Sequence, residues 1–210
     1  MDENERRLFL NFCYPSDMPF RSKEIDYDRG YWKHSTNFTI KERNDRIVAC
    51  VQLIRKQDGM LMPLEYAKIS SGLPDAGQPF DVATDCHGGR VAEIYRLRRT
   101  FDVSMEKVVT IINMIFKAIW AKIIQDGLSY LYLTCDSESA ELRNLYLRRL
   151  RFEDTAVTVQ YGTSLKNWSL LRKDCLLHER QYASLGPRNF EFQTYCRSHL
   201  KNKRLIVNDR

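Results

Sequence analysis

One stretch of the sequence carries side chains that could move a proton. Residues 90–99 read Arg-Val-Ala-Glu-Ile-Tyr-Arg-Leu-Arg-Arg, and their alternation predicts a strand. On an ideal strand Glu93 and Arg96 point to opposite faces, because successive side chains alternate. A carboxylate beside a nucleophile can accept its proton, directly or through a water. Glu93 is therefore the candidate general base, and Arg96 need not share its site.

The segments around this strand predict an α/β (α+β) fold. A hairpin precedes an alternation of strand, helix, strand, helix and strand, which predicts a mixed, mostly antiparallel sheet flanked by helices. Residues 66–89 show no period and predict a long loop, either a binding loop or a flexible insertion. The predicted elements are a hairpin over 36–42 and 47–54, helices over 104–125 and 137–150, and strands over 90–99, 128–134 and 155–161.

The charge of the chain is unevenly distributed. Of 210 residues, 33 are Lys or Arg and 27 are Asp or Glu, which gives a net charge of +6. We interpret residues 1–165 as the main domain, and 166–210 as a basic C-terminal extension packed on it. The positive net charge favours binding of an acidic partner, such as nucleic acid, an anionic cofactor or an acidic carrier protein. Nucleic acid is not expected, because no helix-turn-helix, zinc-finger or RNA-reading signature occurs.

The cysteines and histidines do not form a metal signature. The six cysteines lack any C-x-x-C pair, and the four histidines are far apart in the sequence. No metal is therefore expected. The most apolar stretch, 108–124, is interrupted by Lys117 and Lys122, so no membrane span is predicted. The N-terminus carries acids where a signal peptide needs bases, so we expect a cytoplasmic protein.

The second predicted helix and its exit resemble the GNAT acyltransferases. Residues 142–153 read Leu-Arg-Asn-Leu-Tyr-Leu-Arg-Arg-Leu-Arg-Phe-Glu, similar to the family's helix with a Leu-Tyr pair that runs into Gly-Phe-Glu. Arg151 stands in place of that glycine. The family's glycine-rich pyrophosphate loop is absent between Leu97 and Ser104. This departure argues against an ordinary acetyl-CoA-dependent N-acetyltransferase, which is one alternative function; a non-catalytic basic binding protein is the other.

A narrower branch fits the motifs better. Glu93-Ile-Tyr-Arg96 resembles the Glu-x-x-Arg strand of the acyl-homoserine-lactone (autoinducer) synthases, the long-chain N-acyl amino acid synthases and the exosortase-associated acyltransferases. Three further segments resemble motifs of this branch in the same order, over residues 20–165. They are Glu24-Ile-Asp26-Tyr-Asp28, Val51-Gln-Leu53-Ile-Arg55 and Met62-Pro63-Leu64-Glu65.

The resemblance implies transfer of a fatty acyl group from an acyl carrier protein or acyl-CoA thioester to the amine of an amino acid or related small molecule. Tyr146 would then protonate the leaving thiolate, or else be a packed aromatic residue. Met114, Phe116 and Trp120 would line an acyl pocket, or else belong to the core. The implied substrate-binding residues are Asp26, Asp28, Arg55 and Arg96. Arg96 would pair with Asp26 or Asp28, whereas a solvated acidic turn is the alternative for the two acids and a surface position is the alternative for Arg55. The implied residues for the acyl donor are Leu97, Arg98, Arg99 and Ser104.

Overall fold

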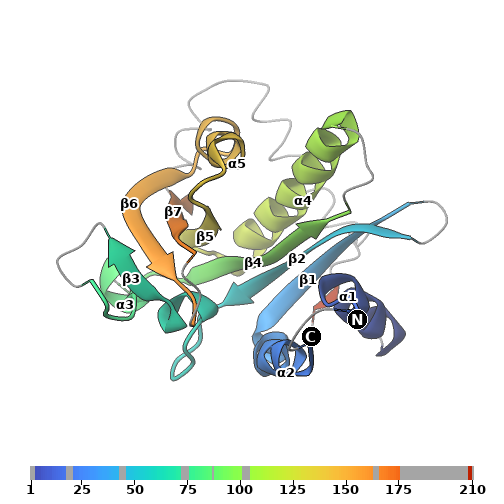
Figure 1. Ribbon diagram of the computed structural model, residues 1–210, viewed down its shortest axis with the longest axis horizontal. Coiled ribbons are helices and arrows are strands. Elements are labelled where there is room, and N and C mark those ends of the chain that lie inside the picture. The colour runs from blue at the N-terminus through green and yellow to red at the C-terminus, as the bar shows by residue number, and fades with distance from the viewer. Residues whose placement is uncertain are drawn as a thin grey trace. The chain divides into compact units, whose positions relative to one another are not determined.

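The computed structural model describes residues 3–17, 21–42, 46–71, 76–86, 88–100, 105–162, 166–175 and 208–209. Side chains are not described at a few positions within these ranges, Asp28 among them. The chain divides into two compact units, whose helices and strands are labelled in Figure 1. One comprises Met1–Ile54, Tyr95–Asp126 and Phe190–Arg210, and the other Arg55–Ile94 and Gly127–Asn189. Strand β4 (Val91–Arg99) begins in the second unit and ends in the first.

The first unit is built on the predicted hairpin. β1 (Ser35–Lys41) pairs antiparallel with β2 (Ile47–Arg55), from Ser35 opposite Ile54 to Ile40 opposite Ala49. The two-residue strand β8 (Asn208–Asp209) pairs with the outer side of β1. Helices α1 (Glu3–Cys13) and α2 (Arg21–Tyr31) lead into a 3₁₀ turn, η1 (Trp32–His34). Residues from α1, α2 and β2 form one apolar cluster, so these elements pack together.

The long helix of this unit also confirms the sequence prediction. α4 (Met105–Asp126) starts and ends within one residue of the predicted helix. Gly127 follows with a φ of +61°, a left-handed conformation that ends helices at little steric cost. Ile115 and Ile119, one turn apart, are buried, whereas Met114 is exposed. α4 therefore has one broad apolar face, as its pattern of apolar residues requires.

The second unit contains a mixed, mostly antiparallel sheet in the order β3-β6-β7-β5-β4. β3 (Lys68–Ser71), β6 (Glu153–Gln160), β7 (Trp168–Asp174) and β5 (Tyr130–Asp136) are antiparallel neighbours in that order. The pairing of β4 with β5 is parallel, from Val91 opposite Tyr130 to Ile94 opposite Leu133. The helical elements of this unit are η2 (Pro63–Tyr66), α3 (Val82–Asp85), α5 (Ala140–Asn144) and the π-helix η3 (Leu145–Arg149).

Three local predictions differ from the structure. The aperiodic stretch 66–89 is not one long loop, because it holds β3 and α3, whose N-cap Asp81 accepts from the Ala83 and Thr84 backbone N–H groups. The second helix starts at Ala140 and changes to π-helix at Leu145. The region assigned to the C-terminal extension begins with β7, which lies between β5 and β6 in the sheet. The predicted domain division at residue 165 stays a prediction, because residues 176–207 of the predicted extension lie outside the described residues.

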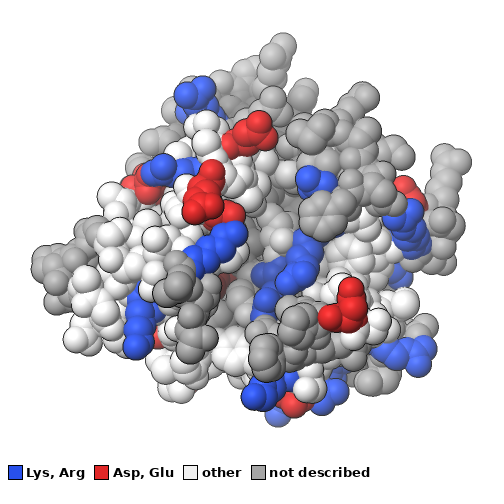
Figure 2. All heavy atoms as spheres, viewed as in Figure 1, with Lys and Arg blue, Asp and Glu red and all other residues white. Residues whose placement is uncertain are grey.

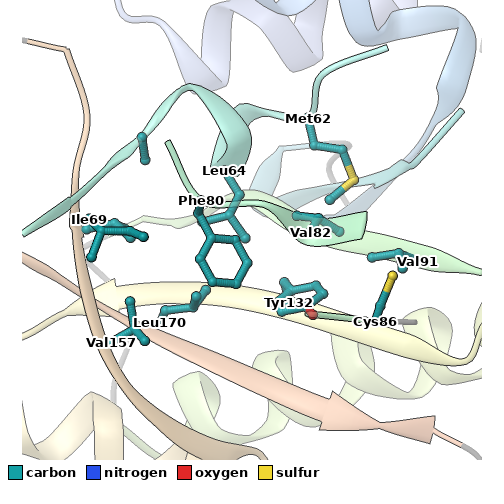
Figure 3. Close-up of a cluster of buried hydrophobic side chains, with 12 residues drawn as sticks. Met62, Leu64, Ile69, Phe80, Val82, Cys86, Val91, Tyr132, Val157 and Leu170 are labelled. Carbon is teal, nitrogen blue, oxygen red and sulfur yellow. The ribbon is translucent and has the colours of Figure 1, made fainter. Parts of the chain in front are cut away.

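An apolar cluster fills one face of the second unit. It contains Leu64 of η2, Phe80 before α3 and Tyr132 of β5, which point into the same interior in Figure 3. The rings of Phe80 and Tyr132 meet edge to face with centroids 5.9 Å apart. Val91 of β4 belongs to the same cluster. Because Glu93 lies two residues further along β4, its side chain lies on this apolar face.

Candidate active site around Glu93

Glu93 is a carboxylic acid enclosed in the second unit. It is 1% exposed, and its register partner on β5 is Tyr132. The backbone N–H of Leu64 donates to Glu93 Oε2 over 3.0 Å. The other oxygen, Oε1, has no hydrogen-bond partner among the described residues. Buried carboxylates normally have hydrogen-bond partners on both oxygens. Glu93 departs from this rule, and its Oε1 is available to receive a proton or a ligand.

Burial makes Glu93 a weak acid. Removal from water disfavours the charged carboxylate and raises the pKa of Glu93 from 4.5 to about 8. The negative charge of Glu65 raises this pKa further, whereas the Leu64 N–H lowers it. A carboxyl group that loses its proton near pH 8 can act as a base toward an amine at neutral to mildly basic pH. The predicted base therefore has the environment that such chemistry needs.

A second carboxylate belongs to the same site, and the sequence reasoning missed it. Glu65 is 8% exposed, accepts from the Met62 N–H over 2.7 Å and pairs with the Lys56 ammonium. Lys56 Nζ also donates to the Met60 carbonyl over 2.8 Å. The Met62–Glu65 motif indicated that this segment mattered. Nothing in the sequence showed that its acid would lie near Glu93.

Tyr146 lies in the π-helix η3 and is 3% exposed. Its ring meets Phe152 edge to face at 6.2 Å, and the Phe152 N–H donates to the Tyr146 carbonyl over 3.1 Å. Burial raises the pKa of the Tyr146 phenol above its usual value, with a smaller contribution from Cys135. The phenol thus keeps its proton at neutral pH, as a general acid must. A shared site with Glu93 was not tested and stays a prediction.

The turn after η3 has a left-handed residue at Arg151, which stands where the resembling motif has glycine. Arg151 has a φ of +56°, the left-handed region that glycine adopts without strain. Lys173 of β7 donates to the carbonyls of Leu150 and Arg151, at 2.6 and 3.2 Å. It therefore caps the C-terminal end of η3. The Lys173 side chain is buried, and removal of its ammonium group from water lowers its pKa to about 8. Arg151 thus has a backbone conformation that glycine adopts more easily than arginine does.

Two predicted substrate residues of the first unit do not pair with each other. Asp26 is exposed and bonds to Arg29 of its own helix, with Nη1 and Oδ1 3.1 Å apart, rather than to Arg96. Arg96 lies over the rings of Tyr14 and Tyr95, 5.2 and 4.7 Å from their centroids. The side chain of Asp28 lies outside the described part. Asp26 is therefore bound by an arginine of its own helix, and the predicted pairing of Arg96 with Asp28 stays a prediction.

Arg96 also breaks the regularity of β4. Its φ of +53° is left-handed, in the middle of a strand. Non-glycine residues adopt this region at an energetic cost, and such positions concentrate at functional sites. The alternation that placed Glu93 and Arg96 on opposite faces assumed an ideal strand, which the chain leaves at this residue. Arg55, half-buried, ends β2.

The predicted acyl-donor and acyl-pocket residues are only partly described. Leu97, Arg98 and Arg99 are half-buried in the last part of β4, and Arg99 donates to the Thr100 carbonyl over 3.1 Å. Ser104 lies outside the described residues. Of the acyl-pocket residues, Phe116 and Trp120 are half-buried and Met114 is 52% exposed. These assignments stay predictions, and the exposure of Met114 does not fit an enclosed wall.

A second polar network in this unit was not predicted. The Tyr132 hydroxyl donates to Asp85 Oδ2, which also pairs with Arg172 Nη1 at 3.1 Å. Arg172 Nη2 lies 3.8 Å from Glu153. The network joins α3 to β5, β7 and β6. It fixes the β5 side chain that faces Glu93, so we regard it as support for the site.

Within the described ranges, no group of three or more His, Cys, Asp or Glu side chains could hold a metal ion. Among those same residues, no helix combines the length and the apolar character that a membrane crossing requires. Figure 2 shows acidic and basic side chains interspersed over the viewed face. The described surface on that face is thus not uniformly basic.

The sequence matches no protein-family model and no curated protein sequence. The structure, however, is similar to solved N-acyltransferases. An N-acyl amino acid synthase from uncultured soil microbes aligns with a TM-score of 0.54 and 11% identity, covering 83% of this chain and 92% of the other. The spermidine/spermine N-acetyltransferase of Vibrio cholerae gives 0.54 and 11%, covering 86% and 93%. The ribosomal-protein-S18-alanine N-acetyltransferase of Escherichia coli gives 0.51 and 9%, covering 83% and 90%.

These similarities confirm the predicted fold. The chain has the fold of the GNAT N-acyltransferases, with a mixed, mostly antiparallel sheet flanked by helices. At such identities the likeness establishes the fold, whereas acyl donor and acceptor must be argued from the site.

Proposed function

We propose that this protein is an N-acyltransferase that moves a fatty acyl group from a thioester to the amine of an amino acid or related small molecule. The thioester would be carried by acyl carrier protein or by coenzyme A. The observation that carries the proposal is Glu93. It is a buried carboxyl group with one oxygen unpartnered among the described residues and a pKa of about 8, in a protein with an N-acyltransferase fold.

The reaction forms a carbon–nitrogen and a sulfur–hydrogen bond, and it breaks a nitrogen–hydrogen and a carbon–sulfur bond. The amine nitrogen attacks the thioester carbonyl, its proton passes to Glu93 through a water, and the carbon–sulfur bond then breaks. Negative charge develops on the carbonyl oxygen, and backbone N–H groups of β4 would stabilise it. The leaving thiolate would take a proton from Tyr146, whose raised pKa keeps the phenol protonated at neutral pH. The products are an N-acyl amine and a free thiol.

The remaining roles follow the resemblance. Leu97, Arg98, Arg99 and Ser104 would contact the acyl donor, and the two arginines suit the phosphate of phosphopantetheine or an acidic carrier. Met114, Phe116 and Trp120 would contact the acyl chain. The residues proposed to hold the acceptor are Asp26, Asp28, Arg55 and Arg96.

The test is product formation by the purified protein. Fatty acyl carrier protein, fatty acyl-CoA and acetyl-CoA are each offered with a mixture of amino acids and with spermidine. Thiol release is followed with a thiol reagent, and N-acyl products are identified by mass spectrometry. We expect N-acyl amino acids from a long-chain donor, and their loss in Glu93→Gln. Absence of any amide product with all three donors would refute the proposal.

Acetyl transfer from acetyl-CoA is the second candidate, and a specific observation favours it. Two of the similar structures, the spermidine/spermine and the ribosomal alanine enzymes, are acetyltransferases by name. Against it stands the absence of the glycine-rich loop between Leu97 and Ser104. Acetyl products without long-chain products in the same assay would favour this alternative. The cytoplasmic location stays a prediction.

A further inference from the structure

Two carboxylates attach to one short turn of the second unit. The Leu64 N–H donates to Glu93 Oε2 at 3.0 Å, and the Met62 N–H donates to Glu65 Oε2 at 2.7 Å. Glu65 thereby folds the turn back on itself, while Glu93 reaches the same turn from β4. Both residues are buried, at 8% and 1% exposure. Their charges therefore interact with little screening by water.

Lys56 supplies the positive charge at this turn, and both its side chain and its backbone are held by hydrogen bonds. Its ammonium forms the ion pair with Glu65 and donates to the Met60 carbonyl over 2.8 Å. Its backbone N–H donates to the Val91 carbonyl over 2.9 Å, two residues before Glu93 on β4. The ammonium is thus held in one place relative to both acids.

We propose that Lys56 and Glu65 are positioning residues for Glu93: their ion pair holds the turn that donates the Leu64 N–H to Glu93, and it cancels the charge of the second carboxylate. This inference rests on the proposed function only for its catalytic consequence. The ion pair sets the pH at which Glu93 becomes a base, and so regulates the pH range of acyl transfer.

The other charged groups near Glu93 are already balanced. Tyr132, its register partner on β5, donates its hydroxyl to Asp85, and Asp85 pairs with Arg172. Glu65 is the acid whose charge acts on Glu93, and Lys56 is the cation that pairs with Glu65. Removing Lys56 leaves Glu65 uncompensated, which disfavours ionisation of Glu93. Removing the charge of Glu65 favours it.

The experiment measures the ionisation of Glu93 directly, in the full-length protein. Glutamate is labelled with ¹³C at the side-chain carboxyl, and the Glu93 signal is assigned by its absence in Glu93→Gln. Its titration midpoint is then compared in wild type, Lys56→Met, Lys56→Arg and Glu65→Gln. Glutamine at 65 keeps an oxygen for the Met62 N–H, so the turn retains its hydrogen bond.

The expected signature is a pair of shifts with opposite sign. Lys56→Met raises the midpoint by about one pH unit, a tenfold change in proton affinity, and Glu65→Gln lowers it by a similar amount. Lys56→Arg leaves the titration midpoint of Glu93 at its wild-type value, because arginine keeps the positive charge. The matched control is Lys166→Met, which removes a lysine from the exposed ion pair with Asp136 and should leave the midpoint unchanged.

Shifts in the same direction, or none, would overturn the inference. A purely structural role lets water reach Glu93 in either variant and lowers both midpoints together. If Lys56→Met does not fold, Lys56→Gln replaces it, because it also removes the positive charge; a raised midpoint supports the inference and a lowered one overturns it. The acid limb of the rate profile should move with the midpoints. Because the NMR titration needs no turnover, failure of the proposed function would leave this test intact, and failure of this test would leave amide formation standing.

Discussion

Burial of Glu93 should make the stability of the protein depend on pH. The carboxyl group has a pKa of about 8 in the folded protein, compared with 4.5 when exposed, because burial disfavours its charged form. The folded state therefore holds this proton more tightly than the unfolded state does. The stabilisation is complete below pH about 4.5 and is lost progressively until the pH passes about 8.

The magnitude follows from the two pKa values. One pKa unit corresponds to about 1.4 kcal/mol, so the full shift from 4.5 to about 8 amounts to about 5 kcal/mol. Between pH 5 and pH 8 the linkage relation gives a loss of about 3 kcal/mol in the free energy of unfolding. Glu93 is 1% exposed, so screening by solvent does not reduce this figure.

The substitution Glu93→Gln tests this directly. Glutamine can still accept the Leu64 N–H but cannot ionise, so the variant should gain about 3 kcal/mol relative to wild type as the pH rises from 5 to 8. Urea unfolding followed by tryptophan fluorescence measures both proteins across this range. The control is Glu138→Gln, at an exposed position, which should run parallel to wild type. If Glu93→Gln also runs parallel to wild type, burial does not govern this carboxyl and the reasoning fails.

Three further outcomes are expected. Arg151→Gly should raise the free energy of unfolding by about 1 kcal/mol, because φ is +56° there, whereas Arg148→Gly in the π-helix should lower it by a similar amount; chemical denaturation measures both. Tyr132→Phe should cost about 2 kcal/mol of stability in the same assay, since Asp85 loses a buried hydroxyl donor. Tyr146→Phe should lower kcat about 100-fold with KM little changed; an unchanged kcat would remove Tyr146 as the acid.

The sequence was most informative where a pattern is local. The helix 105–126 has a continuous apolar period and a glycine directly after it, and the hairpin alternates on both sides of a turn. The sequence was least informative where an element depends on partners that are distant along the chain. β3 has one buried side chain, Ile69, and is defined by pairing with β6, almost ninety residues later. β7 contains Arg172 and Lys173, and two adjacent charges are not expected in a central strand. In the folded protein Arg172 pairs with Asp85, and Lys173 donates to a carbonyl at the end of η3.

The same division applies to the site. Glu93 could be singled out from the sequence, because Glu93 and Arg96 form a Glu-x-x-Arg pattern that resembles one branch of acyltransferases. The partner acid could not be, since Glu65 meets Lys56 only after the chain folds back through Met60 and the Met62–Glu65 turn. The sequence also left open whether Arg96 pairs with Asp26 or with Asp28. Arg29, three residues along the same helix, binds Asp26, and a local ion pair of this kind leaves no pattern that sets it apart from a surface charge.

Glu93 is better explained as a reacting group than as a structural support for the turn. A structural acceptor for the Leu64 N–H needs one oxygen, which a glutamine or a serine would supply without burying an acid. Here the second oxygen has no partner among the described residues, while the neighbouring acid, Glu65, has two donors. An incompletely bonded carboxyl group in an apolar interior lowers stability at the pH where it ionises. Such an arrangement is consistent with a group that must bind and release a proton during each turnover.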